Sequence, residues 1–436
     1  MKKLSVVVIG SGSSALATVR ELLSSKIALD IKVVDAGNQE EPQNAVGLKS
    51  HFGSLHMYDQ SQDNLRHVKI KPVTWPSASK GGFSRIWGAV INPDSSQDFP
   101  SFIEFNDKSK NQFTTKSAHT ILETYSARKN KSWTLLEHRV AVDPTRCTMC
   151  GKCLTGCPEN AIWFAGDEWT EINEVSFVDK FRVQKISTAD GLLTAYSSTG
   201  RTVTAEVIFL AAGPIASSQI LMRSNFISNS VSFDDSQAVF FPALRIAVRE
   251  NQKSFALSQI SAKSSFSGGE SVYIQLYPDS RNLVESIKMH RASIGKLISK
   301  IWVFLSPWIA TGICYVGPNS SPKLVLTKIE GDKFELSSGL SEEHHHNNSL
   351  YREVSRKILN DFRIFPLFFL GKVSQPGESY HFGSSKEILA FNASPIVKNI
   401  RVVDASSLPH IEAGPITSLV MQNARRIVRE TLEAYT

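Results

Sequence analysis

The chain has 436 residues, of which 42% are hydrophobic and 20% charged, and its formal net charge is +7. This length exceeds what one hydrophobic core usually serves, so we expect two domains, and the composition excludes a largely disordered chain. The lysines and arginines are scattered rather than gathered into a run with aromatic residues, which argues against nucleic acid as a partner. Anionic substrates, acidic redox partners or an anionic membrane surface fit the charge.

The N-terminal segment has the element order of a βαβ unit. The apolar run Leu4–Ile9 predicts a strand buried on both faces, residues Ser13–Leu23 have the periodicity of a helix, and Ile31–Asp35 predicts the next parallel strand. This assignment explains the apolar residues that follow Met1 better than a secretory signal does. We therefore expect an α/β domain here.

The turn between the first predicted strand and the helix is rich in glycine. Gly10 permits a tight turn, Gly12 lets backbone amides approach a pyrophosphate, and Ala15, with Ser14 beside it, stands where the helix packs on the strand. Asp35 closes the second strand, where a carboxylate accepts hydrogen bonds from ribose hydroxyls and repels a 2′-phosphate. The segment predicts binding of FAD or NAD rather than NADP; the alternative is a glycine turn that serves packing alone.

Four of the five cysteines follow one another at short intervals. Their spacing resembles the bacterial ferredoxin motif, in which thiolates bind a 4Fe-4S cluster. The predicted ligands are Cys147, Cys150, Cys153 and Cys157. A zinc site and plain structural cysteines are the alternatives. In two-cluster ferredoxins the cysteine before the proline binds the other cluster, so the fourth ligand is either Cys157 or the distant Cys314. We favour Cys157, because Cys314 lies in an apolar run that predicts a core strand.

The cysteine spacing and the long apolar stretches bear on the cellular compartment. Cysteines at metal-site spacing indicate reducing surroundings, so we expect a cytoplasmic protein. The uncharged stretch Ile301–Pro322 is interrupted by prolines and glycines, and we expect no transmembrane helix. Residues 287–308 place apolar side chains and basic side chains on opposite faces of a predicted helix. This pattern predicts either a helix that covers the central sheet or a peripheral contact with the inner face of the membrane.

The middle of the chain has a different pattern. Short β-rich segments separated by turn residues predict an antiparallel sheet over residues 238–248, 255–263, 272–277 and 324–336. A strand at Val207–Leu210 and a last strand at Ile400–Val403, before a long helix, return to the α/β pattern. The α/β domain is therefore expected to be discontinuous in sequence.

Three further segments resemble the glucose-methanol-choline (GMC) oxidoreductases, a superfamily of FAD enzymes, and they occur in that family's order. They are KGGFSRIWG at Lys80–Gly88, VIFLAAGPIASSQIL at Val207–Leu221 and NIRVVDAS at Asn399–Ser406. The resemblance implies a Rossmann-like FAD-binding domain, the pattern of the middle of the chain predicts an antiparallel-sheet substrate domain, and the cysteine motif predicts a small ferredoxin-like insertion. We predict these domains at residues 1–110, 165–225 and 376–436 for FAD, 226–375 for the substrate and 140–164 for the insertion.

The resemblance also implies which residues surround the flavin nucleotide. Gly81, Gly82 and Ser84 would lie at the pyrophosphate and ribityl chain, and Trp87 would lie near the flavin ring. Ala212 and Gly213 would pass the adenosine half, and Asp404 would lie near the pyrophosphate. The last motif would aim the backbone amides of Pro415, Ile416 and Thr417, at the start of the final helix, toward the N1/C2 edge of the flavin, where a reduced flavin is negatively charged.

The turn around His381 resembles the family's histidine turn, in which an imidazole over flavin N5 takes the alcohol proton as the hydride leaves. The family adds a second His or Asn just before the proline of the last motif, where this chain has Gly414. His410 and Glu412 are nearby substitutes; the alternative is that no partner exists. The triplet His344–His346 predicts an exposed loop.

Together these features predict an FAD-dependent dehydrogenase that oxidises a CH–OH group of a sugar, glycoconjugate or other alcohol. Electrons would leave through the 4Fe-4S cluster to an external acceptor such as a ferredoxin, a cytochrome or a quinone. The alternatives are an electron-transfer flavoprotein between such carriers, and a ferredoxin-driven reductase on the same fold.

Overall fold

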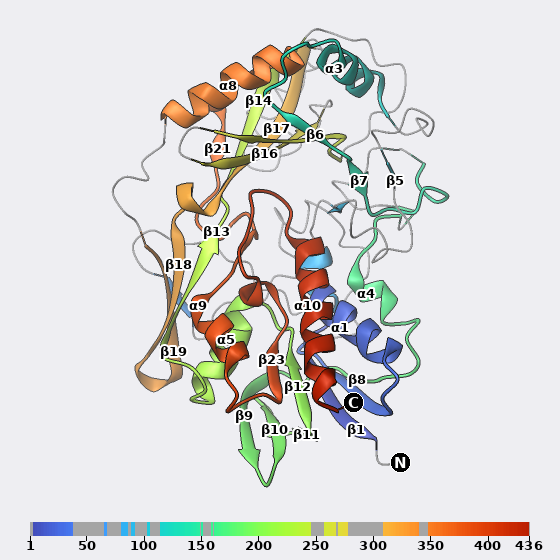
Figure 1. Ribbon diagram of the computed structural model, residues 1–436, viewed down its shortest axis with the longest axis vertical. Coiled ribbons are helices and arrows are strands. Elements are labelled where there is room, and N and C mark those ends of the chain that lie inside the picture. The colour runs from blue at the N-terminus through green and yellow to red at the C-terminus, as the bar shows by residue number, and fades with distance from the viewer. Residues whose placement is uncertain are drawn as a thin grey trace, which may run out of the picture.

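The computed structural model shows a mixed α/β chain with a five-stranded parallel sheet, a five-stranded sheet that is mostly antiparallel and a seven-stranded antiparallel sheet (Figure 1). It describes residues 3–37, 65–67, 80–85, 89–91, 103–104, 114–148, 150, 158–159, 161–245, 257–266, 269–277, 308–339 and 348–435. Among the predicted features, Trp87, Cys153, Cys157, His344–His346 and residues 287–307 lie outside this part of the chain.

The parallel sheet has five strands in the order β23-β12-β1-β2-β8. They are β1 (Leu4–Ile9), β2 (Leu29–Val34), β8 (Ser176–Val178), β12 (Val207–Leu210) and β23 (Ile400–Val402). Every neighbouring pair is parallel, so β1 in the centre is paired on both edges. Its β-branched residues Val6 to Ile9 are buried on both faces, as expected for a central parallel strand. Segments far apart in the sequence thus form one sheet.

Helices and a small sheet cover the two faces of this parallel sheet. On one face, α1 (Ser13–Ser24) and α10 (Thr417–Leu432) lie side by side (Figure 1) and share a core with Val6 and Val8. On the other face, Val7 and Ile9 pack in a core with α5 (Pro214–Arg223) and α9 (Lys386–Ala393). The three-stranded antiparallel sheet of β9 (Val183–Ala189), β10 (Leu192–Ser197) and β11 (Thr202–Ala205) joins that second core.

The first antiparallel assembly has the strand order β22-β13-β18-β19-β3. It contains β3 (Leu65–His67), β13 (Ser230–Asp235), β18 (Lys323–Ile329), β19 (Lys333–Gly339) and β22 (Phe382–Gly383), with β3 parallel to β19. The predicted segment 324–336 is a hairpin of β18 and β19, which a short 3-10 turn at Glu330–Asp332 connects.

The seven-stranded sheet has the order β20-β14-β17-β16-β15-β6, with β21 also paired to β14. Its strands are β6 (Thr134–Leu136), β14 (Ala238–Leu244), β15 (Ile260–Ser265), β16 (Ser271–Tyr277), β17 (Ile309–Val316), β20 (Phe365–Pro366) and β21 (Lys372–Val373). All its pairs are antiparallel, which agrees with the pattern predicted for the middle of the chain. A further small antiparallel sheet joins β4 (Val90–Ile91), β5 (Ile103–Glu104) and β7 (Arg139–Val140).

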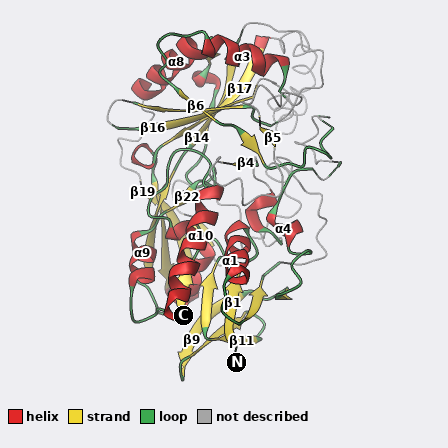
Figure 2. Cartoon of the chain, turned by 45° about the vertical axis from the view of Figure 1, so that its right-hand side comes forward, coloured by secondary structure: helices red, strands yellow, loops and turns green. Residues whose placement is uncertain are grey.

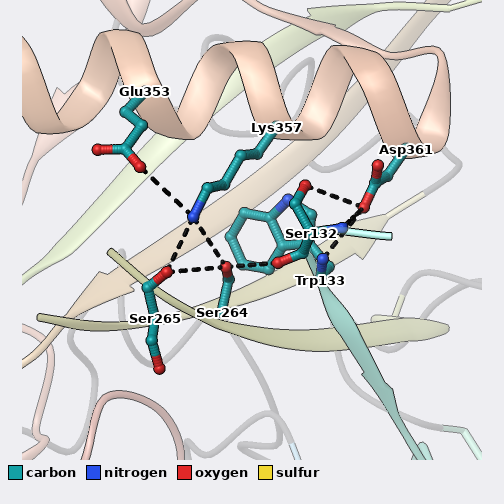
Figure 3. Close-up of polar contacts among 7 residues, drawn as sticks. All are labelled: Ser132, Trp133, Ser264, Ser265, Glu353, Lys357 and Asp361. Carbon is teal, nitrogen blue, oxygen red and sulfur yellow. Dashed lines mark hydrogen bonds and ion pairs between the residues drawn. The ribbon is translucent and has the colours of Figure 1, made fainter. Parts of the chain in front are cut away.

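The two faces of the seven-stranded sheet have different neighbours. The outer face packs against α3 (Lys116–Ser126) and α8 (Asn348–Phe362) in one apolar core, and the inner face looks toward the parallel sheet (Figure 2). Two polar residues of α8 tie it to the sheet (Figure 3): Asp361 accepts hydrogen bonds from the backbone of Ser132 and Trp133, and Lys357 donates to Ser264 and Ser265.

The remaining helices are short. They are α4 (Ala165–Glu168) and 3-10 turns at Gly82–Arg85, Pro318–Ser320, Phe368–Leu370, Ala405–Ser407 and Glu433–Tyr435. Over the described residues, no helix combines the length and the apolar composition that crossing a bilayer requires.

Candidate functional site

The predicted nucleotide-binding residues meet at the carboxyl edge of the parallel sheet. Ile9 is paired with Val34 and with Leu210, and Leu210 is paired with Val402, so the loops that follow these four strands start at one edge. Those loops carry Gly10, Asp35, Gly213 and Asp404. Ligands of open α/β sheets bind at this edge, because the loops of several strands converge there.

The glycines of this edge are needed for two different reasons: the close approach of two loops, and free space beside the backbone. Gly10 has a φ of +107°, and a Cβ there would lie 2.4 Å from the carbonyl oxygen of Ala211, so Gly10 is required for the close approach of two loops. By contrast, a Cβ at Gly12 or Gly213 would meet nothing within 4 Å. These two glycines open on free space, which suits a bulky phosphate group beside the backbone.

Three helices begin at this edge without a side-chain cap. Gly12, Gly213 and Ile416 are the N-cap residues of α1, α5 and α10, and none of them has a side chain that accepts a hydrogen bond from the first turn of its helix. The N-termini of α3 and α9 are instead capped by Thr115 and Ser385. Uncapped N-termini leave backbone N–H groups available to an anion, as a pyrophosphate or a reduced flavin would provide. The residues at this edge therefore fit FAD.

Ser11, which the motif does not specify, connects three parts of the edge. Its hydroxyl accepts a hydrogen bond from the Gly81 N–H at 2.9 Å, and its carbonyl accepts one from the Trp169 indole at 2.7 Å. Burial raises the pKa of Asp35, and hydrogen bonds from the Ser11 hydroxyl and from the Gly37 N–H at 2.6 Å oppose that rise. The second glycine motif is thereby fixed to the first, and a Cβ at Gly82 would lie 3.6 Å from Gly12.

Asp404 stabilises the loops around the edge. Its carboxylate accepts hydrogen bonds from the Ser217 hydroxyl at 2.5 Å and from the N–H and hydroxyl of Ser406 at 3.0 and 2.6 Å. Burial raises the pKa of Asp404, and these hydrogen bonds lower it. Asp404 thus joins the start of α5 to the turn after β23, and it lies on the same edge as Gly213.

The cysteine-containing segment leaves and re-enters the fold at one place. Asp143 N–H donates to the Ala161 carbonyl at 2.8 Å, Trp163 N–H donates to the Ala141 carbonyl at 2.9 Å, and Val142 and Ile162 form an antiparallel bridge. We call these paired residues, 141–143 and 161–163, the stem. The stem closes a loop that contains all four clustered cysteines, of which Cys147 and Cys150 are half-buried.

The residues that directly follow the stem, Ala165 and Gly166, contact the second glycine motif. The Ala165 N–H donates to the Ser84 hydroxyl at 2.9 Å, and that hydroxyl donates to the Gly81 carbonyl at 2.6 Å. A Cβ at Gly81 would lie 2.4 Å from the backbone nitrogen of Gly166. The backbone that directly follows the cysteine-containing segment is therefore in contact with the second glycine motif.

Cys314 lies in another core. It is on β17 and fully buried in the apolar core beneath α3 and α8, where burial raises the pKa of its thiol. Cys147 packs against the core of α1 and α10 instead. The arrangement favours Cys157 over Cys314 as a fourth ligand. The described residues include only Cys147 and Cys150 of the motif, and among the described residues no three metal-binding side chains converge.

His381 lies at the inner face of the seven-stranded sheet. Its ring contacts the Tyr315 ring with centroids 4.5 Å apart, and its Nδ1 is enclosed without a hydrogen-bond partner. Burial lowers the pKa of His381 to about 4, so the imidazole is neutral near pH 7. A neutral imidazole is the form that accepts a proton.

The space beside Gly414, the residue before Pro415, is filled by the ring of Tyr273 from the seven-stranded sheet. A Cβ at Gly414 would lie 2.8 Å from a ring carbon of Tyr273, and Gly414 has a φ of +113°. The Tyr273 and Tyr315 rings lie 6.0 Å apart, and Tyr315 in turn contacts the His381 ring. The other predicted substitutes lie at the surface: the His410 side chain is 73% exposed, and Glu412 forms an ion pair with Lys263.

A directed chain of hydrogen bonds begins at Tyr273. Its hydroxyl donates to Ser261 Oγ at 2.7 Å, and Ser261 contacts Nδ1 of the fully buried His138. His138 Nε2 lies 2.7 Å from the Ser258 carbonyl, which only accepts, so Nε2 carries the proton. Burial lowers the pKa of His138 to about 4, so Nδ1 is unprotonated and accepts from Ser261. Sequence reasoning missed His138, because its partners are distant along the chain.

Comparison with known proteins gives two findings. A family model described as a 4Fe-4S binding domain matches residues 139–162. Among solved structures, the chain is similar to pyridoxine 4-oxidase from Mesorbium loti, with a TM-score of 0.60 and 13% identity over 98% of this chain and 99% of that chain. No curated protein matches the sequence. The structural likeness establishes a shared fold over nearly the whole chain.

Proposed function

We propose that this chain, which has the fold of the GMC oxidoreductase pyridoxine 4-oxidase and carries a 4Fe-4S binding segment, is an FAD-dependent dehydrogenase acting on CH–OH groups. The observation that carries this proposal is the contact between the residues that directly follow the stem and the second glycine motif, from Ala165 to Ser84 and from Gly166 to Gly81. A flavin bound along that motif would lie beside the loop that holds the cysteines. Electrons taken from an alcohol could then leave one at a time.

The residues of the carboxyl edge would hold FAD. Gly12 and Gly213 leave room for its phosphates, Gly82 packs beside Gly12, Asp35 would accept from a ribose hydroxyl, and the uncapped N-terminus of α10 would face the flavin. The predicted positions at Gly10, Ser14, Ala15 and Ala212 shape the same loops. When bound, FAD supplies a two-electron acceptor for hydride, and a cluster on the four cysteines supplies a one-electron exit.

His381 is the proposed base. Its neutral imidazole would accept the substrate hydroxyl proton at Nε2, since Nδ1 is enclosed. The Tyr315 ring restricts the orientation of the imidazole and excludes water from one side. We further propose that residues 226–375 shape the substrate pocket, that residues 140–164 form the iron-sulfur insertion, and that the acceptor is a ferredoxin, a cytochrome or a quinone.

Anaerobic purification followed by visible absorption, iron and sulfide analysis and electron paramagnetic resonance after dithionite tests the cofactors. The proposal expects flavin bands, about four irons per chain and a cluster signal. Flavin without iron would remove the proposed electron exit.

A pair of histidine variants tests the enzyme itself. His381→Ala is expected to slow alcohol-dependent flavin reduction by about 10²- to 10⁴-fold with flavin content unchanged. His410→Ala, at an exposed position, is the matched control and is expected to keep the wild-type rate. An unchanged rate in His381→Ala would reject His381 as the base. Flavin that no alcohol reduces in the unmodified protein would instead favour an electron carrier without an organic substrate.

A further inference from the structure

The inner face of the seven-stranded sheet is the wall next to His381, and its composition can be followed through the strand register. Because alternate residues of a strand share a face, the residues aligned with Tyr315 and Tyr273 lie on this wall. The first row is Lys263, Tyr273, Tyr315 and Ala238, and the second row is Ser261, Gln275, Ile313 and Phe240. The wall thus divides into a half on β15 and β16 and a half on β17 and β14.

The half on β15 and β16 is polar, and its hydrogen bonds have a fixed direction. Since Tyr273 donates to Ser261, its oxygen accepts from Gln275 Nε2 at 3.4 Å, and Gln275 Oε1 accepts from the Tyr277 hydroxyl at 3.1 Å. His138 sets this direction, because its Nδ1 accepts from Ser261. The second amide hydrogen of Gln275 and the oxygen of the half-buried Tyr277 remain for a ligand.

The half on β17 and β14 is largely apolar and opens outward. Phe240 and Ile313 pack in one cluster with Tyr273 and Tyr315. Further from His381, Ile309 is paired with Leu244, and Leu244 is paired with Phe365. Leu244 is 46% exposed and Phe365 45%, whereas Tyr315 is 8% exposed. Exposure therefore rises along the apolar half away from the histidine.

We propose that the substrate is an amphiphilic alcohol, with a polar end against Gln275 and Tyr277 and an apolar chain along Phe240, Ile313 and Leu244. This inference rests on the proposed function and narrows it. A sugar that is polar all round would leave its hydroxyls unpaired against the apolar half, which is costly. The substrate carbon gives its hydride to the bound flavin and its hydroxyl proton goes to His381, which leaves a carbonyl product. The two electrons pass to the external one-electron acceptor.

A matched substrate series tests the inference on the holoenzyme. The 1-O-alkylglycerols with chains of two to ten carbons present one polar end with an apolar chain of varied length, and glycerol and glucose are the comparison compounds without a chain. We expect kcat/KM for flavin reduction to rise about two- to fourfold per methylene until the chain passes Leu244. A rate independent of chain length, or a preference for glucose, would overturn the substrate class and leave the dehydrogenase intact.

A binding measurement that needs no turnover distinguishes failure of this inference from failure of the proposed function. If no alcohol reduces the flavin, the proposed function fails, and thermal shifts with glycerol and octylglycerol still report on the wall. A larger shift with octylglycerol supports an apolar half that binds a chain, and equal shifts refute it.

Two pairs of variants separate the halves of the wall. Leu244→Asp is expected to flatten the dependence of kcat/KM on chain length, while Leu192→Asp on β10, at a residue of similar exposure (44%), should leave it unchanged. Ser261→Ala breaks the directed chain and is expected to raise KM for every alkylglycerol by a common factor, whereas Ser261→Thr keeps the hydroxyl and should restore it. A chain-length slope that survives Leu244→Asp would refute the placement of the chain.

Discussion

The ring of Tyr273 lies against the α-carbon of Gly414, where a side chain at position 414 would have to be. We therefore expect Gly414→Ala to lower the free energy of unfolding by about 1–3 kcal/mol, through the clash and through the positive φ. Urea unfolding measures this loss. In Tyr273→Ala/Gly414→Ala the clash is absent, so the double variant should be more stable than the sum of the single effects. Strict additivity would show that the ring does not fill this space.

We expect substitutions of the clustered cysteines to remove the iron and a substitution of Cys314 to leave it in place. Cys147→Ser, Cys153→Ser and Cys157→Ser are expected to lose most of the iron and the cluster signal, whereas Cys314→Ala keeps both, because Cys314 is enclosed in the core beneath α8. Flavin content should survive in all four, since the stem is held by backbone hydrogen bonds. Iron retained in Cys157→Ser and lost in Cys314→Ala would reverse the assignment.

Stability should fall as the pH is lowered from about 6.5 to about 4. His138 has its folded pKa lowered to about 4, so in this window the unfolded chain binds a proton that the folded chain does not. This group alone removes up to about 3 kcal/mol by pH 4. Chemical denaturation at a series of pH values measures the slope. His138→Gln should reduce it and the exposed His410→Ala should not; equal slopes in all three proteins would contradict a buried neutral His138.

We expect Asp361 to stabilise the packing of α8 on the seven-stranded sheet (Figure 3). Its carboxylate accepts from the Ser132 N–H at 2.7 Å, the Ser132 hydroxyl and the Trp133 N–H at 3.0 Å, and it is 2% exposed. Asp361→Ala leaves two backbone donors unpaired, and we expect a loss of roughly 2–4 kcal/mol. Asp361→Asn keeps an acceptor oxygen and should lose less. The melting temperatures of the two variants check this order, and equal losses would assign the effect to charge alone.

Much of the fold follows from local patterns in the sequence. The run of β-branched residues at Leu4–Ile9 and the turn after it identify the central parallel strand, and alternation over residues 238–244 and 272–277 identifies strands of the antiparallel sheet. These elements are predictable because burial on one or two faces leaves a period in the chain. The GMC resemblance, carried by four short segments, is confirmed at the level of the fold.

The wall beside His381 could not be predicted in the same way. Tyr273, Ser261 and His138 come from three separate strands or loops, and only the sheet register brings them together. The alternation of Tyr273, Gln275 and Tyr277 did carry a local signal, since three polar groups at every second residue of a strand mark one polar face. The position of the Tyr273 ring beside Gly414 had no such signal, because it depends on the backbone path at Gly414.

Because the stem holds its two ends together, the cysteine loop could be deleted without moving the chain on either side of it. Its two ends, Asp143 and Ala161, are joined by one hydrogen bond of 2.8 Å, so a tight hairpin turn could connect them and leave the chain on either side undisturbed. Such a shortened protein would retain the flavin edge and His381 and would have no route for single electrons. It would have to release its reducing equivalents directly to a diffusing acceptor, as an oxidase releases them to dioxygen. On the proposed function, removing this one loop would therefore exchange a separate electron exit for direct reduction of the acceptor by the flavin.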